Sequence, residues 1–370
     1  MSLDPVIAAE LIKLESKYTY RSEEVYYFNV HRPASLVRQL QHRTEEFDDT
    51  VVPAIFEHAL HEKVYHHEVF TNMGTGHIIV FVQTGSGRDL VLRANHALTT
   101  PEYYMDWERE IASQFEAIGV HSVPILYSDT SRQFFPFDYQ IIEKLSGKDL
   151  ELEWEGTQDN YNQLSFDLGQ IFAKQYQLPA TGWGRWTKDA TGQIVGALPS
   201  HHDYLTAYLD HDLEFITFFK FISSADSNRL HAYFNSPDIT SLFADTTQGY
   251  YMHHDLPDHN VRYDNHKIIS IFDWENAVVF DPICDLGAVP TWKSHYPREK
   301  QFIDGFISEL GHKPANLEAK IAVYLLRTML WKIQFALKGN RLSARHINLF
   351  EEALIRNGLS EVTILGQPSN

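Results

Sequence analysis

The sequence contains a single cysteine, Cys284, and no long hydrophobic run. One cysteine excludes an intrachain disulfide and is compatible with a reducing compartment. We expect Cys284 to pack in the core rather than to act as a nucleophile, because no charged partner is evident beside it. No apolar segment approaches the roughly 20 residues of a membrane-spanning helix, and the start MSLDP lacks the basic and apolar stretches of a secretory signal. These absences predict a cytoplasmic protein with no membrane partner.

Basic residues are scarce relative to acidic ones. The chain has 31 Lys and Arg against 49 Asp and Glu, which is a formal net charge of −18 at pH 7. A surplus of negative charge repels phosphate backbones and acidic lipids at long range, so nucleic acids and membrane surfaces are not expected partners. A cationic small molecule would suit this overall charge better than an anionic one.

Low-complexity tracts, internal repeats and Gly/Ser- or Pro-rich linkers are also absent from the sequence. The chain has 370 residues, of which 44% are hydrophobic. A chain of this length and composition can bury a large core and is long enough for two lobes.

The segment from Tyr250 to Asp273, YYMHHDLPDHNVRYDNHKIISIFD, carries the clearest chemical pattern. Pro257 lacks a backbone N–H and interrupts regular pairing, so Asp255 and Asn260 are predicted in a loop. Transfer of a phosphoryl group to a hydroxyl needs a carboxylate to orient that hydroxyl and take its proton, and it needs oxygen ligands for Mg²⁺. Asp255 can be the base, and Asn260 and Asp273 can hold the metal.

A predicted hairpin brings the two candidate metal ligands together. After the loop, the chain reads as a short strand over residues 260–263, a polar turn at 264–266 and a returning strand over 267–272. Asn260 precedes the first strand and Asp273 follows the second, so both lie at the same end of the pair. An Asp followed five positions later by Asn occurs about once by chance in such a chain, so the hairpin and the terminal Asp supply the specificity.

Further carboxylates follow, in the stretch WENAVVFDPICDLGAV, which contains Asp281 and Asp285. HHDLPDHN resembles the HGD-x4-N loop of the aminoglycoside phosphotransferase and choline kinase family, and FDWENAVVFDPICDLG resembles its IDWE and D-P-x-x-D-L stretches. The resemblance implies an α+β, two-lobed protein-kinase-like fold, with a small antiparallel-sheet N-lobe and a larger, mainly helical C-lobe.

The same resemblance implies roles for individual residues and implies ATP and Mg²⁺ as cofactors. Asp255 would be the catalytic base, with His253 beside it in the catalytic loop. Asn260 and Asp273 would be Mg²⁺ ligands, and His253 and Asp285 would support the loop.

Two departures from the family pattern are visible. His254 stands where the family most often has Gly, and an imidazole there would crowd the acceptor or contact it. A later segment, LSFDLGQIFAKQYQLPATGWGRW, is similar to the family's LG-x-x-LA-x-LH helix and to the GFG-like segment that follows it. Here Gln175 and Tyr176 replace the usual Leu-His. We expect this second departure to affect packing more than chemistry.

The resemblance requires an upstream nucleotide lobe, and its parts occur in order. Residues 65–70, 78–83 and 89–94 read as three antiparallel strands. Between the first two, Gly74 and Gly76 would let the backbone approach phosphates closely.

Arg93, in the third of these strands, resembles the family's phosphate-binding cation, a position where Lys is common. Arg stays charged and can hold phosphate through two donors. By the same resemblance, a helix predicted over residues 101–118 would supply the acid that orients this cation. Glu110 fits that position best, and Glu108 is the alternative on a neighbouring face.

A strand over residues 137–142 leads to a hinge at 143–145, where backbone atoms near Glu143 would meet adenine. We therefore expect an N-terminal helical extension with the nucleotide-binding N-lobe over 1–142, and a helical C-lobe with the catalytic hairpin and acceptor site over 143–370. Apolar spacing predicts helices over 5–16, 34–47, 51–60, 162–176, 204–223, 298–310 and 317–337.

The expected partners are ATP and a small molecule with a hydroxyl group. Within the resembled family the acceptor is an aminoglycoside-like or other amino sugar, an amino alcohol such as choline or a homoserine-like compound, or another sugar, and the fold does not choose among them. The oligomeric state stays open between monomer and homodimer. Candidates on the acceptor side are Asp203, Tyr204, Asp210, Asp212, Glu275 and Trp292.

Two other functions fit parts of the sequence. The triplets His201-His202-Asp203 and His253-His254-Asp255 suggest a metal-dependent phosphohydrolase of the HD type. The second alternative is a kinase-like protein that binds nucleotide without catalysing a reaction. The oxygen ligands Asn260 and Asp273 suit Mg²⁺ and favour the kinase over both.

Overall fold

The computed structural model describes residues 5–18, 25–27, 32–71, 76–97, 99 and 104–366. Gly74 lies outside these residues. The chain divides into two compact units, which we describe separately. The sheet unit comprises Ala34–Asn160 and Asp258–Glu275, and the helical unit comprises Met1–Pro33, Tyr161–Pro257 and Asn276–Asn370.

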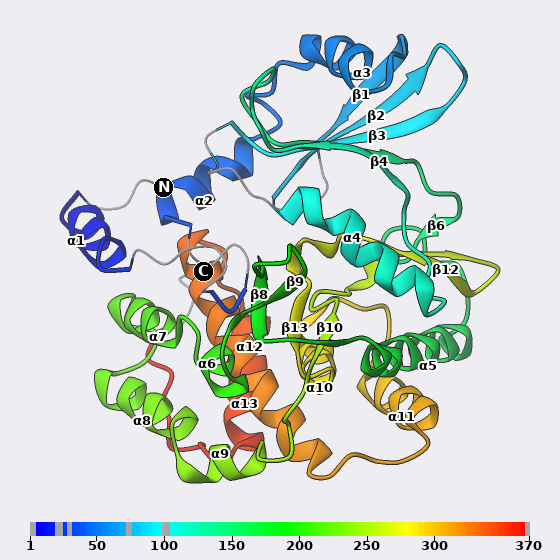
Figure 1. Ribbon diagram of the computed structural model, residues 1–370. Helices are drawn as coiled ribbons and strands as arrows, with labels where there is room; N and C mark the ends of the chain where they lie inside the picture. The colour runs from blue at the N-terminus through cyan, green and yellow to red at the C-terminus, as the bar shows by residue number, and fades with distance from the viewer. Residues whose placement is uncertain are drawn as a thin grey trace. The chain divides into compact units, whose positions relative to one another are not determined.

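The sheet unit is built on an antiparallel sheet of five strands in the order β1-β2-β3-β5-β4 (Figure 1). Its first three strands confirm the predicted meander. Buried and more exposed residues alternate along β2, as expected for a sheet with one face covered. The strands are β1 (Val64–Phe70), β2 (Ile78–Thr84), β3 (Asp89–Ala94), β4 (Ile125–Asp129) and β5 (Tyr139–Glu143).

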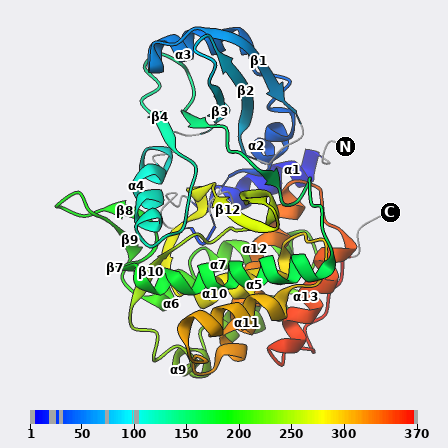
Figure 2. The same cartoon turned by 90° about the vertical axis from the view of Figure 1, so that its right-hand side faces the viewer.

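Helix α3 (Val52–Leu60) covers the sheet and forms the core of the sheet unit with it (Figures 1 and 2). Its apolar residues Val52, Ile55 and Phe56 recur at helical spacing, and all are fully buried. Helix α2 (Ala34–Gln39) precedes it and continues as a 3₁₀ turn over Leu40–His42, so the predicted helix over 34–47 is shorter than expected.

The predicted hairpin forms, from β11 (Val261–Asp264) and β12 (Lys267–Ile271). Asn265 and His266 at its turn have φ values of 47° and 60°. Two consecutive left-handed residues are typical of the turn that matches strand twist in a tight hairpin. The backbone N–H of Phe272 donates to the carbonyl of Asn260 at 3.1 Å, so the residues next to the predicted metal ligands meet at one end of the hairpin.

Pairing with distant segments anchors the hairpin in the sheet unit. Strand β11 pairs with the short β6 (Lys148–Asp149), and the N–H of Ile271 donates to the carbonyl of His121 at 3.0 Å. The fully buried Trp274 packs against Phe115 of α4 (Tyr104–Ala117), with ring centroids 4.3 Å apart. Helix α4 confirms the helix predicted from residue 101.

The helical unit contains a second five-stranded sheet, in the order β7-β10-β13-β8-β9, which the sequence did not predict. Its strands are only two to six residues long, too short for a clear alternating pattern, and their pairings join distant segments. They are β7 (Pro179–Ala180), β8 (Trp183–Lys188), β9 (Ile194–Leu198), β10 (Gly249–Met252) and β13 (Val278–Phe280).

Helix α12 (Leu317–Lys338) is the centre of the helical unit and packs against α7, α10 and α13 (Figure 1). The predicted helix over 204–223 is two helices, α6 and α7, because the chain turns at Tyr208, whose φ is 61°. The helices of this unit are α1 (Pro5–Glu15), α5 (Gln158–Lys174), which begins just before the unit boundary, α6 (His201–Leu205), α7 (Leu209–Phe218), α8 (Ser224–Phe234), α9 (Pro237–Leu242), α10 (Ile283–Ala288), α11 (Glu299–Leu310), α12 and α13 (Ala344–Arg356).

None of the helices in the described parts of the chain has the length and apolar character needed to cross a membrane. The antiparallel sheets and separate helices confirm the predicted α+β class.

The two units are not continuous ranges of sequence. Residues up to Pro33 group with the helical unit, whereas residues 143–160 and the hairpin segment Asp258–Glu275 group with the sheet unit. The expected division into ranges 1–142 and 143–370 differs from this grouping. The assignment of nucleotide and acceptor roles to those two ranges stays a prediction.

Candidate active site

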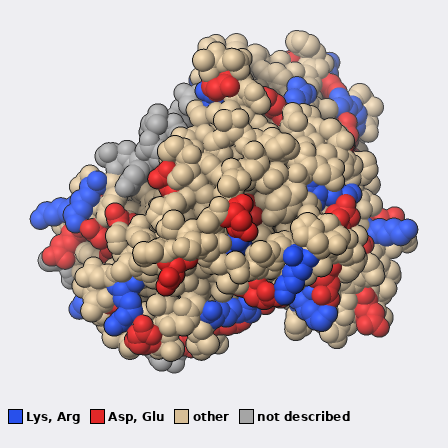
Figure 3. Space-filling model, turned by 60° about the horizontal axis from the view of Figure 1, so that its bottom comes forward, with Lys and Arg blue, Asp and Glu red and all other residues tan. Residues whose placement is uncertain are grey.

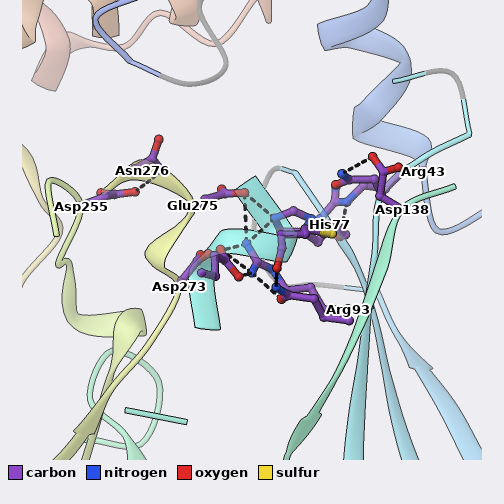
Figure 4. Close-up of polar contacts among 12 residues, drawn as sticks. Arg43, His77, Arg93, Asp138, Asp255, Asp273, Glu275 and Asn276 are labelled. Carbon is purple, nitrogen blue, oxygen red and sulfur yellow. Dashed lines mark hydrogen bonds and ion pairs between the residues drawn. The ribbon is translucent and has the colours of Figure 1, made fainter. Parts of the chain in front are cut away.

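Arg93 is the centre of a buried polar group in the sheet unit (Figure 4). One terminal nitrogen of its guanidinium donates to both carboxylate oxygens of Glu108, at 2.9 and 2.7 Å. The other donates to Asp273 at 2.6 Å and to Glu275 at 3.1 Å. The guanidinium of Arg93, a residue of β3, is therefore hydrogen-bonded to three carboxylates.

The partner of Arg93 on helix α4 is Glu108, which corrects the expectation of Glu110. Glu108 is 1% exposed and shares the buried face of α4 with Met105, Ala112 and Phe115, whereas Glu110 is exposed. Residues three, four and seven positions apart lie on one side of a helix. This spacing was readable in the sequence and favours Glu108.

His77 and Glu275 complete the group, and the sequence did not identify them as part of it. His77 Nε2 lies 2.6 Å from Glu275 Oε2 and 2.7 Å from a guanidinium nitrogen of Arg93. One potential ligand atom from each of His77, Asp273 and Glu275 lies within 4.8 Å of the others. His77 follows the glycine loop and Glu275 follows Asp273 by two positions, and these positions were the only sequence signals.

The balance of charge in this group suits a divalent cation. Burial raises the pKa values of Glu108 and Asp273, and the Arg93 guanidinium opposes both shifts. Three carboxylates against one guanidinium leave an excess of negative charge, and carboxylate oxygens are ligands that Mg²⁺ accepts. Asn260 is buried in the 3₁₀ turn Asp258–Asn260 that leads into the hairpin.

The other predicted nucleotide residues lie in the same unit. Gly76 is buried beside Glu275, whose Oε1 is 4.0 Å from the position a Cβ of residue 76 would occupy. Glu143 is the last residue of β5 rather than the first of a hinge. Its N–H donates to the carbonyl of Pro124 at 3.1 Å, so this N–H is already paired.

The predicted catalytic loop lies in the helical unit, directly after β10. The N–H of His253 donates to the side-chain oxygen of Gln175 at 2.8 Å, and the Gln175 amide donates to Asp285 at 3.1 Å. The N–H of Asp255 donates to Nδ1 of His253 at 3.3 Å. Gln175 thus links the loop to helix α10, a contribution beyond the packing role expected for this departure.

Asp255 is half-buried, and its carboxylate accepts a hydrogen bond from a tyrosine hydroxyl. Its Oδ2 accepts hydrogen bonds from the Tyr27 hydroxyl at 2.5 Å and from the Asn276 amide at 3.2 Å (Figure 4 shows the second). The Tyr27 ring stacks on Trp331 with centroids 3.8 Å apart and planes 8° from parallel. Tyr27, Asn276 and Trp331 were not predicted, and the 228 positions between Tyr27 and Asp255 explain why the sequence carries no signal for that contact.

His254 packs in the interior of the helical unit and is 6% exposed. Its ring lies edge-on to Tyr26, with centroids 5.5 Å apart, and burial lowers its pKa to about 3. The imidazole is therefore neutral and enclosed, which is contrary to the expectation that it crowds or contacts the acceptor. Its φ of 64° is left-handed, and this explains why Gly suits the position.

We expect His254→Gly to be more stable than His254→Ala by about 1 kcal/mol. Both variants lose the buried ring, but only Gly adopts the left-handed backbone without strain. Urea unfolding of the two variants measures the difference. Equal stabilities, or a more stable Ala variant, would contradict the argument from the backbone.

Asp285 supplies a pH-dependent contribution to stability. Burial raises the pKa of this carboxyl to about 7, and hydrogen bonds from Gln175 and the backbone of His254 oppose the shift. Between the usual pKa of about 4 and this value, the folded state binds a proton that the unfolded state does not. The stability that comes from the buried neutral group is present at low pH and is lost as the pH rises through 7.

We therefore expect the unfolding free energy of the wild type to fall by about 2–3 kcal/mol more than that of Asp285→Asn between pH 5 and pH 8. Asn has nearly the same shape and does not titrate. Urea unfolding of both proteins at the two pH values tests this, and parallel pH dependences would refute it.

The first His-His-Asp triplet has structural roles. His201 is buried, with Nε2 2.7 Å from the Tyr324 hydroxyl, and its ring stacks on Phe280. Asp203 interacts with Ser200, the residue that caps α6. In the described ranges, His77, Asp273 and Glu275 form the only group of three or more possible metal ligands of the His, Cys, Asp and Glu types. Neither triplet belongs to it, so this geometry does not favour an HD-type phosphohydrolase.

The remaining acceptor-side candidates are mostly enclosed. Asp212 is fully buried and accepts from Arg327 at 2.8 Å. Tyr204 is also fully buried, and its hydroxyl donates to the carbonyl of Tyr26 at 2.5 Å. Trp292 is 4% exposed and Glu275 is 6% exposed, and among these candidates only Asp203 and Asp210 are exposed.

Comparison with known proteins identifies the family. A model of the APH phosphotransferase enzyme family matches residues 74–320, which is more than half of the chain. Comparison with curated protein sequences gives no match.

Solved structures share the fold at low sequence identity. A putative fructosamine-3-kinase from Thermobifida fusca is 14% identical, with a TM-score of 0.60 over 82% of this chain and 98% of its own. A thermostable mutant of aminoglycoside phosphotransferase APH(4)-Ia, in complex with AMP-PNP and hygromycin B, is 18% identical, with a TM-score of 0.58 over 83% and 97%. Macrolide 2'-phosphotransferase MphH from Brachybacterium faecium is 17% identical, with a TM-score of 0.54 over 83% and 98%.

These likenesses confirm the predicted protein-kinase-like fold. The matched range contains the segments on which the sequence resemblance rested, from the glycine loop to the carboxylates after the hairpin. The chain therefore belongs to the APH phosphotransferase enzyme family and is a phosphotransferase that acts on a hydroxyl group of a small molecule.

Proposed function

We propose that this enzyme transfers the γ-phosphate of ATP to a hydroxyl of an amino sugar, an amino alcohol or a related small acceptor, with Asp255 as the catalytic base. The observation that supports this most is the hydrogen bond from the Tyr27 hydroxyl to Asp255 Oδ2 at 2.5 Å. The carboxylate already orients a hydroxyl, which is the task that the base performs on an acceptor.

Asp255 is prepared for this task by its surroundings in the helical unit. The Asn276 amide donates to Oδ2 of Asp255, and the N–H of Asp255 donates to His253 and fixes the loop, so Oδ2 keeps a defined direction. In the proposed reaction the acceptor hydroxyl replaces that of Tyr27 and gives its proton to Asp255. The acceptor oxygen bonds to the γ-phosphorus of ATP while the bond from that phosphorus to the β–γ bridging oxygen breaks, and ADP leaves. Most of the acceleration then comes from positioning and charge stabilisation, without a phosphoenzyme.

On the nucleotide side, we propose that Arg93 binds the phosphates, and that Gly74 and Gly76 approach them through their backbone. Glu108 fixes the Arg93 guanidinium through two hydrogen bonds to one nitrogen, which leaves the other nitrogen for a phosphate oxygen. That other nitrogen contacts Asp273 and Glu275 in the structure, so a phosphate would compete with these carboxylates.

We propose that Asp273 and Asn260 hold Mg²⁺, with Glu275 as a further oxygen donor nearby. When bound, Mg²⁺ would neutralise charge on the phosphates. The excess of carboxylates around Arg93 supports a cation here, and a hydrogen bond between Phe272 and Asn260 keeps the two ends of the hairpin together. Backbone atoms near Glu143 remain the proposed contact for adenine.

A coupled assay of ATP consumption, run across amino sugars, amino alcohols, sugars and their acidic derivatives, tests the proposal. We expect one acceptor class to stimulate ADP release, with mass spectrometry showing one phosphate added to the acceptor. Nucleotide binding without turnover of any acceptor would instead favour a non-catalytic kinase-like protein. ATP-independent release of phosphate from a phosphate ester would favour a phosphohydrolase.

A further inference from the structure

Helix α12 carries four basic residues within its mainly buried length, and three of them have clear partners. Lys320 forms an ion pair with Asp245 at 2.6 Å, and Arg327 forms one with Asp212 at 2.8 Å. Lys338 donates to the backbone carbonyl of Arg32 at 2.9 Å. Each is at most 4% exposed, as expected for cations whose burial is compensated by an acceptor.

Lys332 is the exception among these four. It is half-buried, and within the described residues its ammonium has no hydrogen-bond acceptor and forms no ion pair. Its Nζ lies 4.7 Å from the ring centroid of Trp331. Burial lowers the pKa of Lys332, and the negative charge of Asp255 opposes the shift. An ammonium that is half-buried and has no oxygen acceptor from these residues can bond to water or to an oxygen that a ligand supplies.

The position of Lys332 connects it with the proposed acceptor site. Its neighbour Trp331 stacks on Tyr27, and the hydroxyl of Tyr27 is bound to Asp255. Trp331 therefore contacts both the ammonium of Lys332 and the ring of Tyr27, whose hydroxyl marks the proposed place of the acceptor. Lys332 belongs to the helical unit, as do these three residues.

Other basic groups gather around Lys332. Arg345 and His346 are the second and third residues of helix α13, and Arg341 precedes the helix by three positions. The pKa of His346 is lowered by burial and further by the positive charges of Lys332, Arg345 and Arg341. Among the described residues, Asp255 is the only acid that contributes to the pKa shift of Lys332. The local charge beside the proposed acceptor site is thus positive, although the chain as a whole carries −18.

The overall charge does not decide the charge of one site. On the face shown in Figure 3, acidic and basic side chains are interspersed. Charges on such a surface are screened over about 8–10 Å in physiological salt, whereas a half-buried ammonium next to the acceptor is screened much less.

We propose that Lys332 binds an anionic group of the acceptor, a carboxylate or a phosphate, while the acceptor hydroxyl takes the place of the Tyr27 hydroxyl on Asp255. This inference rests on the proposed function and narrows its substrate class. The acceptor is a hydroxylated small molecule, an amino alcohol or sugar derivative included, that also carries a negative charge. A purely cationic amino sugar would place a positive group near Lys332 and would be disfavoured.

The experiment compares acceptors in matched pairs that share one carbon skeleton. Each pair has a neutral member and an acidic member, such as a sugar and its aldonic acid, a sugar and its phosphate, or an amino alcohol and the hydroxy amino acid of the same length. The carboxylate and phosphate arms distinguish the two sources of negative charge. KM and kcat for each acceptor, and KM for ATP, are measured in the wild type and in Lys332→Gln.

We expect the wild type to prefer the acidic member of at least one pair. Lys332→Gln should raise KM for that acceptor by about 10- to 100-fold, because a hydrogen bond to a charged group is lost. KM for ATP and for the neutral member should change by less than about twofold. Lys332→Arg, which keeps the charge, should retain the preference. Lys300→Gln, at an exposed position of α11 beside Asp304, is the matched control and should behave as the wild type.

Other outcomes overturn the inference in different ways. If the neutral or amino members are phosphorylated as well as their acidic counterparts, and KM in Lys332→Gln is unchanged, the anion site is refuted while the proposed function stands. If Lys332→Gln lowers kcat for every acceptor equally, Lys332 acts on the transferred phosphate instead. If no acceptor is phosphorylated by the wild type, the proposed function fails and this inference fails with it. If Lys332→Gln does not fold, the inference is tested by whether the wild type and Lys332→Arg prefer the acidic member of a pair over the neutral one.

Discussion

Replacing Asp255 with Asn is expected to reduce kcat by about 10²–10⁴-fold while the affinity for ATP stays near that of the wild type. Asn has the same shape, and it can still accept a hydrogen bond from an acceptor hydroxyl, but it cannot take its proton. The Asn276 amide and the Tyr27 hydroxyl both donate to the carboxylate, so the variant also loses the charge that orders these contacts. The nucleotide residues that we propose lie in the other unit, which is why binding of ATP should persist.

The measurement is the steady-state rate with the best acceptor from the screen, together with the Kd of ATP from a binding titration. Asp264→Asn, at the exposed turn of the hairpin, is the matched control and should retain wild-type turnover. Near-normal turnover in Asp255→Asn would remove Asp255 as the base. If a thermal melt shows that Asp255→Asn does not fold, turnover and ATP affinity are compared in Asp255→Glu instead. The longer Glu side chain keeps the negative charge but places it differently.

Replacing Arg93 with Met is expected to destabilise the protein by about 3–5 kcal/mol, the usual effect of removing one partner of a buried ion pair. Glu108 and Glu275 are nearly inaccessible, and Asp273 is close by, so the variant leaves three carboxylates without their shared cation. Each would have to be neutralised or rehydrated. The same change removes the proposed phosphate ligand, so affinity for ATP should fall as well.

Urea unfolding at pH 7 measures the first effect, and nucleotide titration of the folded variant measures the second. Arg88→Met, which removes a half-exposed guanidinium from the turn before β3, should cost no more than about 1 kcal/mol. Arg93→Lys should fall between the two, because it keeps the charge but lacks the second nitrogen that reaches Asp273 and Glu275. A change below about 1 kcal/mol in Arg93→Met would show that these carboxylates do not depend on the guanidinium.

The sequence predicted those parts of the fold whose information is local. These parts carry their own apolar periodicity or turn residues and form close to the expected ranges: strands β1, β2 and β3, helices α3, α4 and α12, and the hairpin of β11 and β12. Glu108 was also within reach of the sequence, because it repeats with Met105 and Ala112 on one face of α4. The prediction of Glu110 did not take into account that this repeat places Glu108 on the buried face of α4 and Glu110 outside it.

The tertiary structure decided the features that depend on distant contacts. The short strands of the second sheet become strands only through pairing, and the neutral, enclosed state of His254 depends on aromatic rings from separate segments. The support that Gln175 gives to the proposed catalytic loop has the same origin, since its amide group joins His253 to Asp285 across the helical unit.

By itself, the sequence determined the order of the chemical groups: a glycine loop, a cation on a strand, a carboxylate and an amide around a proline loop, and further carboxylates after a hairpin. That order is sufficient for a family and a type of reaction, because phosphoryl transfer to a hydroxyl needs those groups. Only the tertiary structure placed Tyr27 on Asp255, Gln175 between His253 and Asp285, and Lys332 beside Trp331 without an oxygen acceptor among the described residues. Hydrogen bonds and burial are set by distances in space, and these cannot be read from separation along the chain.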